Sequence, residues 1–488
     1  TWDGLIDDVG IWDRPISEEE IALIYNGGEG APLVSAGAQI PEPRLASVNG
    51  NADGVSFQIR DVDGAAVNPD SVAVTVDGAE VEVVKSNADG VTRVTYSAPE
   101  LLAPESEHTL EVALEDTNGN SVKLERGFRV RAYSLVDSTY RLPESSKGES
   151  GFIAYLTQIH AGQGVGGGGL HGNSWQNAEK QIRGEYIDPA GEGEPYLNEA
   201  DPEAWEGWTY MPTIVEMVNL NQDAPAGVGN FNEGNGYPDE PIPGIPGWGD
   251  STDGIAGEYL TMLKLPAGPH TFGVNSDDGF SATFGANYLD IQQQQVGVFN
   301  GGRGASDTTF NFYVQDAGLY PFRVSWWEGT GGANIEIFSM VDVDGTATRV
   351  LINDPDVEGS IKAFTPKGSV DGVDESTTER LTTGRVYISG LSPGDGSFAT
   401  TKNIELTVVN GSVSTLDQGS VLFVYDGEVV SHKVSSDGDT LVISYDATSG
   451  GNGDHTAIVE YSDSAGNTRT TEWSFALADP VEEGQLNL

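Results

Sequence analysis

The chain contains no cysteine among its 488 residues and only 4 methionines. The lack of cysteine excludes a disulfide framework, a thiolate metal site and a cysteine nucleophile. Long apolar runs are lacking as well: no stretch of about 18 consecutive apolar residues occurs, so we expect no membrane insertion. The first residues, TWDGLIDDVGIW, have no basic start, apolar run or small-residue cleavage site, and so do not form a signal peptide.

Basic residues are scarce. The chain has 24 lysines and arginines against 75 aspartates and glutamates, which gives a formal net charge of −51. Nucleic acid and anionic lipid need clustered Lys and Arg to displace their counterions, so we exclude both as partners. The charge suits divalent cations and a salty medium, where screening relieves self-repulsion. A solvated, soluble surface is by itself a sufficient reason for most of this charge.

Catalytic patterns are missing too. The sequence has no Gly-x-Ser-x-Gly elbow, no His-Glu-x-x-His and no dinucleotide fingerprint. Of the six histidines, only His160 and His171 lie close in sequence, and neither has a third ligand in an evident frame. The glycine-rich stretch 162–173 lacks the Lys-Ser/Thr of a phosphate loop, so we expect a mobile loop there. We therefore expect a non-catalytic protein.

Short alternating runs separated by Asp-Gly turns dominate the chain, as in SVAVTVDGAEVEVVKS (71–86), and these are typical of β-hairpins. Helical periodicity is confined to 17–28, 173–186 and, more weakly, 212–222. The sequence predicts an all-β, multidomain string of β-sandwiches with a few short helices.

An internal repeat divides the chain. EHTLEVALEDTNGNSVKLERGFRV (107–130) aligns with DHTAIVEYSDSAGNTRTTEWSFAL (454–477), so that His108 matches His455. We interpret both histidines as residues of the fold, because each lacks a second ligand nearby. The two copies resemble bacterial immunoglobulin-like modules. We expect the following domains: sandwiches at 34–132 and 381–480, a different central domain at 133–380, and a tail at 481–488.

The segment GLIDDVGIWDRPISEEEIALIYNGG near the start resembles the closing strand and final helix of laminin-G-like (concanavalin-type) jelly-roll domains. Residues 1–33 would then be the C-terminal end of an incomplete domain, which cannot bury its apolar face alone. Two alternatives stay open. The rest of the domain lies upstream, or the segment packs on another element, including one of a neighbouring subunit.

Two stretches of the central domain, GEYLTMLKLPAGPHTFGVNSDDGFSATFG (257–285) and DAGLYPFRVSWWEGTGGANIEIFSM (316–340), resemble the protective-antigen type of carbohydrate-binding β-sandwich. That resemblance implies that Asp277 and Asp278 hold one calcium ion, often across a cis peptide, and that sugar hydroxyls complete its coordination. A bare hairpin turn with both carboxylates in water is the alternative.

Calcium takes six to eight oxygen ligands, so further oxygens must come from a second loop. The stretch 328–334 is the expected neighbour, with Glu328 and Asn334 as candidate ligands. Trp326 and Trp327 are adjacent on a strand, so we expect one indole to face outward. We assign Trp327 to stacking on a sugar ring, with packing over the core edge as the alternative.

These features together predict a secreted, extracellular or cell-surface protein that binds a polysaccharide or other glycan through a calcium-dependent site. The order of modules is similar to that of very large secreted bacterial proteins. One alternative is a self-associating structural subunit of a filament, sheath or stalk. Another is an accessory region of a larger polysaccharide-degrading enzyme.

Overall fold

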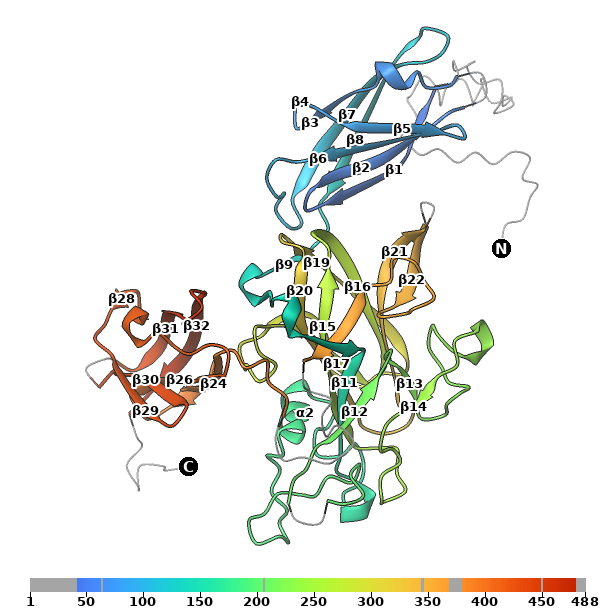
Figure 1. Cartoon of the computed structure of the whole chain (residues 1–488). Coiled ribbons are helices and arrows are strands. Elements are labelled where there is room, and N and C mark those ends of the chain that lie inside the picture. Colours follow the sequence, from blue (N-terminus) through green and yellow to red (C-terminus); the bar gives the residue numbers. More distant parts are fainter. Residues whose placement is uncertain are drawn as a thin grey trace, which may run out of the picture. The chain divides into compact units, whose positions relative to one another are not determined.

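The computed structural model describes residues 42–62, 65–204, 207–343, 346–367, 380–448 and 451–479. The protein is all-β and multidomain, and its contacts divide it into two units, Thr1–Ala132 and Tyr133–Leu488 (Figure 1). The helix expected at 17–28, the jelly-roll end at 1–33 and the tail at 481–488 lie outside the described residues. Within the described part of the chain, no helix combines the length and apolarity that a membrane crossing requires.

The first unit is a sandwich of two four-stranded sheets. One sheet has the order β1-β2-β6-β5 and the other the order β4-β3-β7-β8. Alternate residues of β3 and β7 are buried, because side chains of a strand point to its two faces in turn. The strands are β1 (Arg44–Asn51), β2 (Gly54–Arg60), β3 (Ala73–Val76), β4 (Ala79–Val81), β5 (Val84–Ala88), β6 (Val91–Ser97), β7 (Glu107–Glu115) and β8 (Ser121–Arg129).

The C-terminal part of the second unit has the same strand order. Its sheets run β24-β26-β30-β29 and β25-β32-β31-β27-β28, which reproduce the first unit's orders with β25 added. In both copies the matched histidine contacts the aspartate of a turn, 2.7 Å from His108 Nδ1 to Asp77 Oδ2 and 2.7 Å from His455 Nδ1 to Asp426 Oδ2. These histidines are therefore residues of the fold, as expected. The strands are β24 (Tyr387–Ser392), β25 (Phe398–Ala399), β26 (Asn403–Val409), β27 (Leu422–Tyr425), β28 (Glu428–Val429), β29 (Lys433–Asp437), β30 (Thr440–Asp446), β31 (Gly453–Ser462) and β32 (Thr468–Leu477).

The central sandwich packs an eight-stranded sheet on a seven-stranded one. The first has the order β10-β23-β15-β20-β17-β18, with β11 beside β15 and β12 beside β11. Its strands are β10 (Lys147–Ser150), β11 (Phe152–Gln158), β12 (Met211–Val215), β15 (Ile255–Leu265), β17 (Gly279–Phe284), β18 (Gln294–Phe299), β20 (Gly318–Glu328) and β23 (Lys362–Pro366).

The seven-stranded sheet has the order β14-β13-β21-β16-β19-β9, with β22 beside β21. Aromatic rings from the two sheets meet in the core, as where Phe272 and Phe312 pack on Phe322 and Phe284. Its strands are β9 (Ser134–Val136), β13 (Asn219–Asn221), β14 (Glu240–Pro241), β16 (Gly268–Asp277), β19 (Ser306–Val314), β21 (Asn334–Val343) and β22 (Thr346–Leu351).

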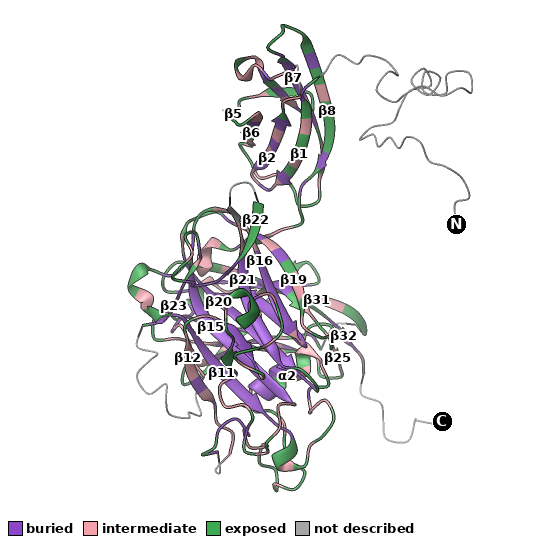
Figure 2. Ribbon diagram, turned by 90° about the vertical axis from the view of Figure 1, so that its right-hand side faces the viewer, coloured by how far each residue is buried: buried purple, intermediate pink, exposed green. Residues whose placement is uncertain are grey.

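A second layer covers the outer face of the eight-stranded sheet. Helix α2 (Trp175–Ile182) confirms the helix expected within 173–186, and its Ala178 and Ile182 pack on Trp327 of β20. Long stretches of β15 and β20 are consequently buried on both faces, as Figure 2 shows in purple. Short 3-10 turns connect other strands, at Pro69–Ser71, Ser138–Tyr140, Glu144–Ser146, Ala161–Gln163, Glu233–Asn235 and Gln418–Ser420.

The prediction of a helix at 212–222 is wrong. The segment forms β12 and β13, which pair with β11 and β21. Pro212 lies inside β12 opposite Tyr155, and the partner strands satisfy backbone groups that a short helix would have bonded internally. Tertiary pairing therefore overrides the local periodicity.

Candidate functional site

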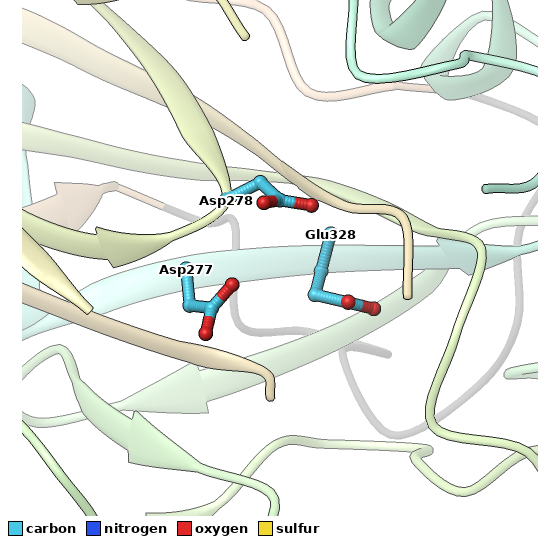
Figure 3. Close-up of side chains that lie close together, drawn as sticks. All are labelled: Asp277, Asp278 and Glu328. Atoms are coloured by element: carbon cyan, nitrogen blue, oxygen red, sulfur yellow. The ribbon is translucent and has the colours of Figure 1, made fainter. Parts of the chain in front are cut away.

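Three acidic side chains meet at one end of the central sandwich (Figure 3). Asp277 ends β16, Asp278 connects β16 to β17, and Glu328 ends β20. The peptide bond between Asp277 and Asp278 is cis. The two aspartates do not diverge to opposite faces, and one oxygen from each of the three carboxylates lies within 4.8 Å of the others.

Backbone donors fix the position of the Asp278 carboxylate. The Arg303 N–H donates to Asp278 Oδ1 at 2.6 Å, and the Gly329 N–H donates to Oδ2 at 3.0 Å. The residue is 5% exposed, whereas Asp277 beside it is half-buried. Each Asp278 oxygen still has a lone pair free, because a carboxylate offers about four acceptor positions.

Glu328 is fully buried, yet both of its carboxylate oxygens accept no hydrogen bond from any described residue. Burial, followed by the nearby charges of Asp253, Asp278 and Asp277, raises the pKa of Glu328 to about 9. Burial and the charge of Asp278 raise the pKa of Asp277 to about 6. A buried charge is normally paired with a cation or bound to a metal. The Arg303 guanidinium lies near the two aspartates and partly offsets the rise of the Asp277 pKa, but no described cation is paired with Glu328.

Asn334 begins β21 and lies directly opposite Asp277 in the strand register. Its Nδ2 donates to Asn275 Oδ1 at 3.1 Å, and its Oδ1 is buried without a hydrogen-bond partner in the described part of the chain. The candidate donor set is therefore oxygen only, and the side-chain oxygens of Glu328 and Asn334 have no hydrogen-bond donor among the described residues. This set fits a hard divalent cation and does not fit a soft transition metal.

Two supporting residues were missed by sequence reasoning. The Arg303 side chain lies 4.2 Å from the centre of the Phe299 ring and donates to the Ser276 hydroxyl oxygen at 2.9 Å. Asn173, at the end of the glycine-rich loop, lies so close to Gly302 and Gly329 that a Cβ at either would meet its amide within 2.6 Å. Both residues come from irregular segments, and no periodic signal marks them.

The expectation that Trp327 stacks on a sugar is wrong. Trp326 and Trp327 are both 0% exposed. Trp326 lies in the core between the sheets, and Trp327 lies beneath α2 on the opposite face of β20. The alternation of the two side chains is as expected, but the outer face is covered by a second layer instead of solvent.

A polar pocket of about 710 Å³ opens beside Asp277. Its walls come from the segment after β13, from the start of β19 and from the loop before β21. Most of the lining is amide, carboxylate or backbone, and no aromatic ring takes part: Asn221, Gln222, Asp223, Val228, Gly229, Asn230, Asn275, Asp277, Ala305, Ser306, Asp307, Gly332 and Ala333.

The histidines near the glycine-rich loop form no comparable site. His160 Nδ1 lies 2.8 Å from the Ser251 hydroxyl oxygen, and His160 Nε2 lies 3.1 Å from the Gly167 carbonyl oxygen. His171 is fully buried, and that burial lowers its pKa to about 4. Among the described residues, only Asp277, Asp278 and Glu328 gather three acidic, His or Cys side chains at metal-ligand spacing.

No family model matches the chain, and no curated protein matches it. Among solved structures, a PA14 sugar-binding domain from an RTX adhesin is 18% identical over 42% of this chain and 96% of that chain, with a TM-score of 0.25. The epithelial adhesin 9 A domain of Candida glabrata, in complex with Galβ1-3GlcNAc, is 14% identical over 48% and 98%, with a TM-score of 0.27.

An endo-β-1,4-mannanase from Thermotoga petrophila is 14% identical over 20% of either chain, with a TM-score of 0.16. At TM-scores this low, we draw no functional conclusion from any of these matches.

Proposed function

We propose that the central sandwich binds a glycan through a calcium ion held by Asp277, Asp278, Glu328 and Asn334, and that the protein acts outside the cell or on its surface. The observation that carries this proposal is the buried carboxylate of Glu328, which lies close to two further carboxylates and has no hydrogen-bond donor among the residues that the structure describes. An oxygen-binding dication neutralises this cluster, whereas water or a neutral donor leaves its charge uncompensated.

The four protein residues leave room for ligands from outside. Calcium takes six to eight oxygens, and each of these side chains offers one or two. Asp277 is the half-buried member of the cluster and lines the polar pocket, so that pocket is where sugar hydroxyls would reach the ion. Vicinal hydroxyl groups of a saccharide are neutral oxygen ligands of the kind that calcium accepts.

The pocket lining favours hydrogen bonding over ring stacking. The Nδ2 of Asn221 and the Oε1 of Gln222 are buried there without a hydrogen-bond partner among the described residues, so one donor and one acceptor are available to a ligand. Saccharide hydroxyls both donate and accept, and they match such an amide pair. The names of the matched adhesin structures agree with this proposal, but the proposal does not rest on them.

The flanking modules at 34–132 and 381–480 fit a spacer role in this proposal. Their shared strand order supports assigning both to one immunoglobulin-like type. In neither module do the described residues gather three acidic side chains as the central sandwich does.

A glycan array tests the proposal. The full chain is applied with calcium and, separately, with a chelator, beside Asp278→Asn and the control Asp89→Asn. Asp89 is an exposed residue of another Asp-Gly turn, with a φ of 53° that Asn also adopts. We expect glycan binding by the parent and the control in calcium only. Equal binding by Asp278→Asn, or no glycan bound by any protein, would overturn the proposal.

A further inference from the structure

Among the tryptophans that the structure describes, Trp248 is the most exposed, at 44%. It lies in the loop between β14 and β15, at the second position of the turn 247–250. A hydrogen bond of 2.9 Å from the Asp250 N–H to the Gly247 carbonyl oxygen closes this turn. An indole at such a corner buries little of its surface in the core, so much of the ring is available to a ligand.

The indole is held in a fixed position. Its six-membered ring lies on Gly162, where an added Cβ would be 2.4 Å from Trp248 Cζ3 and 2.6 Å from Cε3. The Trp248 N–H donates to the Glu199 carbonyl oxygen at 3.1 Å, and the Gly162 N–H donates to Glu199 Oε2 at 2.9 Å. Glu199 itself is 0% exposed. A ring that is fixed before binding loses little conformational entropy when a ligand packs on it.

The loop that carries Trp248 also contacts the segment beside the carboxylate cluster. The Gly331 N–H donates to Asp253 Oδ1 at 3.2 Å, and the next residue, Gly332, lines the polar pocket. The segment 329–332 therefore connects the polar pocket with the loop of Trp248. A glycan that leaves the pocket across this segment reaches the loop that presents the indole.

The surroundings of the indole favour a saccharide over a protein surface. Protein-binding sites present contiguous apolar patches, but no other exposed large apolar side chain belongs to the described loops 160–173 and 236–254. The neighbouring carboxylates are accessible, since Asp250 is exposed and the Asp253 side chain is 30% exposed. A pyranose ring has a face of C–H groups that packs on an aromatic ring, and hydroxyl groups that donate to carboxylates.

We infer that Trp248 forms a second saccharide position, where its indole stacks on a sugar ring further along the glycan that is bound at the carboxylate cluster. This inference rests on the proposed function, and it supplies the aromatic contact that the lining of the polar pocket lacks. Such a position adds affinity for longer glycans and leaves the affinity for single sugars unchanged.

The dependence of affinity on chain length tests this inference. Binding of gluco-, manno- and galacto-oligosaccharides of one to six rings is measured by calorimetry in calcium, with the full chain as parent, Trp248→Leu, Trp248→Phe and the control Phe398→Ala. Leucine and phenylalanine both cover Gly162, but only phenylalanine offers a ring. We expect Trp248→Leu to bind the longer chains about 5- to 10-fold more weakly than the parent, and Trp248→Phe to bind them nearly as well. Phe398 is 67% exposed and lies in β25, so its variant should match the parent.

The outcomes separate this inference from the proposed function. Equal affinities of the parent and Trp248→Leu at every chain length would overturn the inference, even where Asp278→Asn abolishes binding. A loss as large for single sugars as for long chains would place the indole at the first ring and overturn a second position. A parent that binds none of these saccharides would also overturn the inference, whereas the glycan array decides on the proposed function separately.

A purely structural role of the indole has its own signature. Thermal unfolding in chelator checks that Trp248→Leu and Trp248→Phe are folded, and both should melt close to the parent because both cover Gly162. Equal losses of glycan affinity in the two variants would show that packing on Gly162, and not stacking on a sugar, is what the indole provides.

Discussion

At the scale of single residues, Glu328 differs from the other buried carboxylates of the central sandwich. Glu179 and Glu258 are ion-paired with Arg323, and Asp278 accepts two backbone N–H groups. Glu328 has neither kind of partner among the described residues. Folding the metal-free protein therefore costs free energy, because this carboxyl must either bury its charge or take up a proton. A neutral side chain at this position should remove that cost.

Glu328→Gln should stabilise the metal-free protein and abolish its response to calcium. At pH 7, raising the pKa from 4.5 to about 9 costs the folded state about 3 kcal/mol, which a neutral amide avoids. Thermal unfolding in chelator should show a higher melting temperature for the variant than for the parent. Added calcium should raise the melting temperature of the parent but not that of the variant. A variant that melts lower in chelator and still responds to calcium contradicts this assignment.

The pH dependence of the metal-free protein follows from the same residue. The pKa of Glu328 is higher in the folded state than in the unfolded state, so the folded state holds the extra proton. The stability from this proton is complete below about pH 4.5 and is lost as pH rises towards 9, at up to about 1.4 kcal/mol per pH unit. Urea unfolding in chelator between pH 5 and 9 should show this decline, and Glu328→Gln should show a shallower one. A parent curve that is flat or rises with pH would refute the prediction.

At the scale of elements, β20 shows how the second layer shapes the site. One face of this strand contributes Trp326 to the core between the sheets, and the other places Trp327 beneath α2. Helix α2 is held there by Glu179, whose oxygens accept from Arg323 Nη1 and Nη2 at 2.7 and 3.0 Å. Because β20 ends in Glu328, the packing of α2 also fixes one wall of the carboxylate cluster.

Glu179→Ala should destabilise the protein by about 3–5 kcal/mol, because it leaves Arg323 and Arg380 sharing Glu258 alone. The double variant Glu179→Leu/Arg323→Met removes one charge of each sign and should recover much of that loss. Urea unfolding of the parent, Glu179→Leu, Arg323→Met and this double variant completes a double-mutant cycle. A cost below about 1 kcal/mol for Glu179→Ala would show that the helix is held by its apolar face alone.

Much of this arrangement could be predicted from the sequence. Alternation and turn chemistry indicate the strands, and the adjacent aspartates and the loop after β20 indicate the cluster. The packing of α2 on the outer face of β20 could not be predicted. The sequence of this short helix indicates that a helix forms, but not which strand it packs against. The contact of Asn173 with Gly302 and Gly329 was missed for a similar reason: these residues lie far apart in the sequence and come from irregular segments.

At the scale of the whole molecule, the net charge of −51 opposes folding through self-repulsion. Raising monovalent salt shortens the Debye length from about 14 Å at 0.05 M to about 4 Å at 0.5 M. We expect melting temperatures in chelator to rise by several degrees over this range of NaCl. Melting temperatures that fall or stay constant would show that the acidic residues are spaced widely enough not to interact.

The same charge concentrates divalent cations near the surface, so specific sites must be separated from diffuse binding. A calorimetric titration of calcium into the full, metal-free chain in 0.3 M NaCl does this most directly, with Asp278→Asn and Glu328→Gln compared with Asp89→Asn. We predict saturable binding in the parent and in Asp89→Asn, with one ion fewer in each of the other two variants. The same stoichiometry and affinity in all four proteins would contradict a metal site at Asp277, Asp278 and Glu328.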